Sequence, residues 1–90
     1  MIKVDVEQFR ALAHSGGVVS VTLEGQGKDF VLAIETRGGP AMLVLANDKD
    51  KQRTFVDPRR ALLLLRELGL LKAHINLEGW NPKAGLNVES

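Results

Sequence analysis

One stretch decides the fold: Arg53-Thr54-Phe55-Val56-Asp57-Pro58-Arg59-Arg60, which continues as Ala61-Leu62-Leu63-Leu64-Leu65-Arg66-Glu67-Leu68-Gly69. Asp57 suits the N-cap of a helix, and Pro58 suits its first position, where a missing N–H removes no intrahelical hydrogen bond. Gly69 suits the residue that ends a helix. The stretch therefore predicts a strand over residues 52–56 that breaks directly into a helix.

Two arginines, Arg59 and Arg60, stand in the first turn of this predicted helix. A helix N-terminus carries partial positive charge, so each cation there costs a few tenths of a kcal/mol, up to about 1. An anion bound at the same place would turn this cost into a gain. Two interpretations stay open: the arginines pair with Asp57 or with acids of the preceding turn, or they belong to a basic surface suited to phosphate. The further members of that surface would be Lys49, Lys51, Arg53 and Arg66.

The rest of the chain alternates between capped helix and strand patterns. A capping box at Asp5 and Gln8 predicts a helix over residues 6–15. Alternating or apolar segments predict strands over 18–24, 30–36, 41–46 and 71–77, in addition to 52–56. The resulting order is α-β-β-β-β-α-β. Helices at the ends of a meander predict one α+β domain over residues 1–80, with an antiparallel sheet of four to five strands, followed by a C-terminal tail over 81–90.

Composition limits the classes of function. The formal net charge is +1, from 12 Lys+Arg against 11 Asp+Glu, which argues against a generic binder of polyanions but allows a local basic patch. The chain has no cysteine, so disulfides and thiolate chemistry are excluded and an intracellular protein is expected. The apolar runs, such as residues 41–46 and 61–65, are too short to span a bilayer. We expect a cytoplasmic protein with no membrane partner.

Catalysis and metal binding have almost no support in the sequence. His14 and His74 are the only histidines, and they do not form a pair at metal-ligand spacing. Ser15 follows His14 directly, and adjacent residues of a helix do not face each other, so the two do not form a nucleophile and base. We therefore expect no enzyme activity, no catalytic residue, no metal site and no cofactor.

Exposed apolar residues point to a partner. Leu62 and Leu63 lie outside the core stripe expected for their helix, so they either flank a broad stripe or are covered by a second subunit. Trp80, the sole tryptophan, either covers the sheet edge or serves as an interface anchor or a stacking platform for a base. We expect a homodimer with Leu62, Leu63 and Trp80 at its interfaces.

One pattern extends the opening stretch: Arg53-x-Phe55-x-Asp57-Pro58-x-x-Ala61-Leu62-x-Leu64-Leu65-Arg66-x-Leu68-Gly69, then a strand and Gly79-Trp80. In this pattern the chain resembles small ParC-like partition-associated proteins encoded on bacterial plasmids, over most of its length up to Trp80. The resemblance implies an accessory role in plasmid maintenance, beside the partition ATPase and the centromere-binding protein. The strand and helix that begin at Arg53 are also similar to the arm-binding domains of tyrosine recombinases, which place a three-stranded sheet into DNA.

Two functions follow from these observations. The first is a non-enzymatic accessory protein of plasmid partition that is associated with DNA through a basic surface. That surface would consist of Arg53, Arg59, Arg60, Lys49 and Lys51. The alternative is an adaptor that holds a partner protein through its apolar surface without contacting DNA. The near-neutral net charge favours the adaptor, whereas the arginines at the helix start and the resemblance favour DNA.

Overall fold

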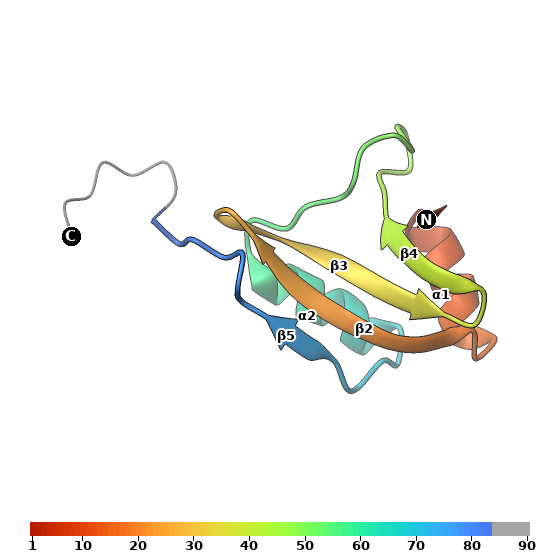
Figure 1. Cartoon of the computed structure of the whole chain (residues 1–90). Helices are drawn as coiled ribbons and strands as arrows, with labels where there is room; N and C mark the ends of the chain where they lie inside the picture. The colour runs from red at the N-terminus through yellow and green to blue at the C-terminus, as the bar shows by residue number, and fades with distance from the viewer. Residues whose placement is uncertain (84–90) are drawn as a thin grey trace.

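The computed structural model describes residues 1–83, which form one mixed five-stranded sheet with both helices packed on the same face (Figure 1). In chain order the elements are β1 (Ile2–Val4), α1 (Val6–His14), β2 (Val18–Gln26), β3 (Asp29–Thr36), β4 (Gly39–Leu43), α2 (Pro58–Glu67) and β5 (His74–Asn76). Across the sheet the strand order is β1-β4-β3-β2-β5. Of the predicted tail over 81–90, residues 84–90 lie outside the described residues.

The α+β class is confirmed, but the predicted antiparallel sheet and the predicted order α-β-β-β-β-α-β are wrong. β3 is antiparallel to both β2 and β4, whereas β1 pairs with β4 and β5 pairs with β2 in parallel. Each helix carries the chain back across the sheet, so the strand after a helix runs in the direction of the strand before it. The additional strand β1 has three residues, too few to show an alternating pattern.

The strand predicted over residues 52–56 does not form. Gln52 and Phe55 make single bridges, to Val44 and Phe30 respectively. Phe55 and Phe30 exchange two backbone hydrogen bonds, with N···O distances of 2.7 and 2.9 Å. Since β4 already pairs with the remainder of this edge of β3, only a short length is left for the returning chain. The segment before α2 is therefore held by isolated contacts, to Phe30 of β3 and to Leu43 and Val44 at the end of β4, and not by a continuous strand pairing.

Helix α1 begins as the capping box predicts. The carboxylate of Asp5 accepts a hydrogen bond from the Gln8 backbone N–H, and the backbone N–H of Asp5 donates to the side chain of Gln8, both at 2.9 Å. Gly16, with φ of +77°, allows the left-handed turn that ends the helix. Phe9 on the inner face is completely buried. Local signals and packing therefore agree throughout α1.

Helix α2 also begins as predicted, and the core holds one of its faces. The Asp57 carboxylate accepts a hydrogen bond from the Arg59 backbone N–H at 2.9 Å. Ala61, Leu65 and Leu68 are buried against the inward residues of the sheet. Burying a leucine contributes about 1.5–3 kcal/mol, so this face fixes the helix on the sheet. The two flanks of α2 are left at the surface.

Candidate functional site

The first surface feature beside α2 is a group of three arginines, Arg53, Arg59 and Arg60, called here the arginine cluster. They lie around a shallow pocket of about 500 Å³. The other residues that line this pocket are Asp57, Leu63, Leu64 and Glu67. Three of the five residues predicted to contact nucleic acid are therefore brought together by the fold.

Arg53 is positioned by the segment that precedes α2. Its backbone N–H donates to the carbonyl of Leu43 at 2.9 Å. Its guanidinium carbon lies 5.1 Å from the centroid of the Phe55 ring, in a cation–π arrangement. Phe55 is itself buried and hydrogen-bonded to Phe30. The charge of Arg53 is thus presented from a fixed support at the edge of the pocket.

Arg59 and Arg60 are exposed in the first turn of α2. Within residues 1–83, neither of them forms an ion pair. The Asp57 carboxylate is engaged with the Arg59 backbone N–H, and Asp50 pairs with Lys3 at 3.5 Å. The structure therefore does not support the interpretation in which the two arginines are neutralised by neighbouring acids.

The two predicted lysines are not part of the cluster. The Lys49 ammonium lies 3.6 Å from the Asp5 carboxylate, at the start of α1. Lys51 is exposed, and its carbonyl accepts a hydrogen bond from the Leu45 N–H at 2.9 Å. Neither lysine lines the pocket of the arginines. The predicted basic surface is thus smaller than the sequence suggested.

The charges around this pocket suit a small anion with several oxygen atoms. Two carboxylates also line it, Asp57 and Glu67, but each already has a partner. Asp57 accepts the hydrogen bond of the helix cap, and Glu67 forms an ion pair with Arg10 at 3.3 Å. A guanidinium group can donate two parallel hydrogen bonds to a phosphate. The arginine cluster therefore has the chemistry of a phosphate contact.

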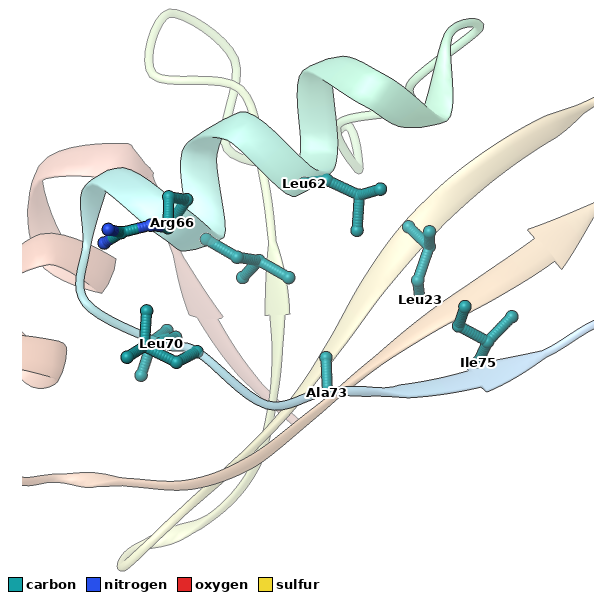
Figure 2. A pocket seen from close by; sticks show the side chains of 8 residues that line it. Leu23, Leu62, Arg66, Leu70, Ala73 and Ile75 are labelled. Atoms are coloured by element: carbon teal, nitrogen blue, oxygen red, sulfur yellow. The ribbon is translucent and has the colours of Figure 1, made fainter.

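The second surface feature is an apolar groove of about 370 Å³ between α2 and β5, called here the α2–β5 groove (Figure 2). It is lined by Leu23, Leu62, Leu65, Arg66, Leu70, Leu71, Ala73 and Ile75. Figure 2 shows Leu62 reaching down from the helix and Ile75 pointing up from the strand toward it. Ile75 is 62% exposed and Leu71 is 70% exposed, so the groove opens to the surface.

The three predicted interface residues lie in three different places. Leu62 lines the α2–β5 groove, whereas Leu63 lines the pocket of the arginine cluster. Both are about half exposed, at 48% and 53%. Trp80 lies in neither place, because its ring packs on Phe30, with 5.4 Å between the ring centroids. One continuous interface through all three residues is therefore not formed within one chain.

Trp80 covers the end of the sheet, as one of its two interpretations expected. A Cβ atom at Gly25 would lie 2.3 Å from the Trp80 Cβ, so only glycine leaves room for the tryptophan there. The backbone beside it is fastened to Gly27, which receives a hydrogen bond from Asn81 and donates one to Gly79. Trp80 as a whole remains 37% exposed. The packing of Trp80 accounts for its position without a partner.

Some features of the two surfaces were not predicted from the sequence. The support of Arg53 by Phe55 could have been found, because residues two apart in an extended segment lie on one side. The ion pair of Glu67 with Arg10 joins the two helices and has no local signal. The α2–β5 groove was missed because residues 71–77 were expected to bury one face, whereas every residue of this segment is exposed.

Two further findings concern the described part of the chain. In residues 1–83, no three side chains of histidine, aspartate or glutamate gather in the manner of a metal site. Neither α1 nor α2 has the length and the apolar composition that a helix needs to cross a bilayer. The histidines His14 and His74 are both exposed.

Comparison with known proteins adds no assignment. The sequence matches no model of a protein family, and it has no significant similarity to a curated protein. The function is therefore inferred from the two surfaces described above and from the pattern of the sequence.

Proposed function

We propose that this chain is a non-enzymatic accessory protein of plasmid partition that contacts DNA phosphates through the arginine cluster. The observation that supports the proposal is the gathering of Arg53, Arg59 and Arg60 around one pocket, with no ion pair to any of them within residues 1–83. The resemblance to ParC-like partition-associated proteins supports the same role. Contacts to phosphate position a protein on DNA without reading its sequence.

The size of the cluster sets the strength expected of such a contact. Few phosphates can be reached by three arginines, and the formal net charge of the whole chain is only +1. A single copy would therefore bind DNA weakly at physiological salt. We propose that the protein acts in the cytoplasm as a homodimer, with partition proteins as further partners. Two copies would double the number of phosphates contacted and raise the apparent affinity.

One observation favours a second candidate, an adaptor that binds a partner protein without contacting DNA. The α2–β5 groove exposes Leu62, Leu71 and Ile75 together. Exposed apolar surface of this kind marks sites of protein interaction. The adaptor does not need the arginine cluster, so the two candidates differ in what removal of the arginines does.

The test is binding to duplex DNA across a series of salt concentrations. A complex held by phosphate contacts weakens steeply, with a slope of log K against log salt of about −0.9 for each phosphate neutralised. The double variant Arg59→Glu/Arg60→Glu should reduce the steepness of this slope by about 2 per chain. It should weaken binding to all DNA sequences alike.

A matched control keeps the charge change and moves it elsewhere. Lys28→Glu/Lys83→Glu reverses the same number of charges at two exposed lysines that do not line the pocket. This control should retain most of the affinity. Equal losses in both double variants would mean that only total charge matters and would remove the arginine cluster as a site. Absence of DNA binding at low salt would leave the adaptor as the remaining candidate.

A further inference from the structure

We propose that Arg10 of α1 keeps the arginine cluster open to anions by holding the Glu67 carboxylate, which otherwise competes with a bound phosphate for the same arginines. The inference rests on the phosphate contact proposed above and assigns it a positioning residue. Arg10 does not line the pocket of the cluster, whereas Glu67 does. The residue that decides whether the site is available therefore lies on the other helix.

Glu67 lies where its charge matters to a bound anion. It follows Arg60 by seven residues and Leu63 by four, so the three residues share the face of α2 that lines the pocket. Side chains of a helix lean toward its N-terminus, so a Glu67 side chain without a partner would lean toward the arginines. Seven residues of helix rise about 10 Å, close to the Debye length of ~8 Å at physiological salt. An uncompensated carboxylate at this position would therefore repel a phosphate and attract the guanidinium groups.

Arg10 gives this carboxylate a partner. Its Nη1 atom donates a hydrogen bond to Glu67 Oε1 at 3.3 Å. Its Nε atom lies 3.7 Å from Oε1 of Glu7, one turn earlier in α1. Acids from both helices thus orient one guanidinium group, and the Arg10 side chain is only 32% exposed. The charge of Glu67 is therefore compensated and drawn toward α1.

The other carboxylate of the pocket is restrained by a different contact. Asp57 accepts a hydrogen bond from the Arg59 backbone N–H at 2.9 Å as the cap of α2. Loss of Arg10 would therefore release Glu67 alone. Within residues 1–83, the three arginines of the cluster form no ion pair, which is the state that an incoming phosphate requires. The pair of Arg10 with Glu67 preserves that state.

This contact makes the site depend on the packing of both helices. Arg10 and Glu67 are 57 residues apart in the chain, and they meet because α1 and α2 pack on the same face of the sheet. The Glu67 side chain is 61% exposed, and an exposed ion pair is weak, so the pair can open without unfolding the protein. Opening of the pair would lower the affinity of the cluster for phosphate. Availability of the cluster is therefore set by a contact outside it.

A double-mutant cycle tests this inference. Arg10→Gln removes the partner of Glu67 and should weaken binding to a short labelled DNA duplex at low salt about fivefold, the size expected for one exposed charge pair. Glu67→Gln removes the competitor and should leave the affinity unchanged or raise it. In the double variant Arg10→Gln/Glu67→Gln no carboxylate is released, so its affinity should equal that of Glu67→Gln within about twofold.

Two further variants separate positioning from charge and from folding. Glu7→Gln removes a carboxylate from the same guanidinium but leaves the pair with Glu67, so it is the matched control and should not alter DNA binding. Arg10→Lys keeps a cation and should retain most of the affinity. Arg10→Gln and the double variant both lack the link between the helices, so a merely structural role of Arg10 would weaken binding in both.

The outcomes separate this inference from the proposed function. Equal losses in Arg10→Gln and the double variant would overturn it, because Arg10 would then act through its own charge or through the fold. An unchanged affinity in Arg10→Gln would overturn it as well. If the unaltered protein binds no DNA, the proposed function fails, and the same cycle is measured with inorganic phosphate through the rise that it causes in the melting temperature. A phosphate effect that follows the cycle supports the inference without DNA, and absence of this effect in the unaltered protein overturns it.

Discussion

Both helices begin with an aspartate N-cap, but they differ in how well the charges of the first turn are balanced. In α1 the Asp5 capping box is complete, Glu7 supplies an acid in the first turn, and Arg10 forms ion pairs with Glu7 and Glu67. In α2 the cap is Asp57 alone, and the first turn contains no acid. The charges at the start of α1 therefore agree with the helix dipole, whereas those at the start of α2 oppose it.

The apolar residues of the two helices also differ, because those of α1 are covered by the fold and two of those on α2 are not. The large apolar side chains of α1, including Phe9 and Leu12, are buried or half-buried against the sheet. In α2, Leu62 and Leu63 remain about half exposed beside two different surface features. A helix whose residues are satisfied within the fold needs no partner to explain them. The binding surfaces of this protein are therefore placed on α2 and on the strand that follows it.

The largest difference in the free energy of unfolding should appear between a substitution in the core face of α1 and one on the flank of α2. Phe9→Ala removes a completely buried ring and should lower the free energy of unfolding by about 3–5 kcal/mol. Leu63→Ala, at 53% exposure, should change it by less than about 0.5 kcal/mol. Urea denaturation followed by the fluorescence of Trp80 measures both. A loss of several kcal/mol in Leu63→Ala would mean that α2 is as fully committed to the fold as α1.

The same contrast explains which parts of the fold could be predicted. Helix caps and the periodicity of apolar residues are defined by a few neighbouring positions. Both helices and the β2–β3 hairpin were therefore correctly predicted. The direction and the order of the strands depend on partners far apart in the chain. The pairing of β1 with β4 joins Ile2 to Ala41, and no local pattern specifies it. The mixed sheet was therefore not predicted.

The candidate site shows the same limit. The misplaced charges of Arg59 and Arg60 were visible in the sequence because the helix cap fixes their positions. The ion pair of Lys49 with Asp5, which places this lysine away from the arginines, could not be predicted, because the two residues are far apart in the chain. The position of β5 at an edge, with Ile75 uncovered, also follows only from the strand order. Sequence patterns identified the features of α2 but not the geometry around them.

Removal of the two N-caps should lower the free energy of unfolding by smaller amounts, and the two amounts should differ. Asp5→Ala removes the capping box and the ion pair with Lys49, so it should cost toward the upper end of about 0.5–2 kcal/mol. Asp57→Ala removes one hydrogen bond, to the Arg59 N–H, and should cost about 1 kcal/mol. Thermal or urea unfolding of the two variants gives the comparison. If Asp57→Ala proved the more costly, the Asp57 carboxylate would have to stabilise the neighbouring arginines as well as the helix.

The smallest effect has the most direct bearing on function, because it concerns the charges at the start of α2. Replacing Arg59 and Arg60 by glutamine removes two cations from the helix N-terminus and should stabilise the fold by a few tenths of a kcal/mol. Replacement by glutamate should add up to about 1 kcal/mol per residue, less the repulsion from the nearby Asp57 carboxylate. In α1 the reverse change, Glu7→Lys, should destabilise by a similar small amount because it removes the acid of the first turn and the pair with Arg10. Melting temperatures at low and high salt measure all three, and salt should reduce every shift. A fall in stability on removal of the arginines would show that they serve the fold, and the case for a phosphate site on α2 would then lose its main support.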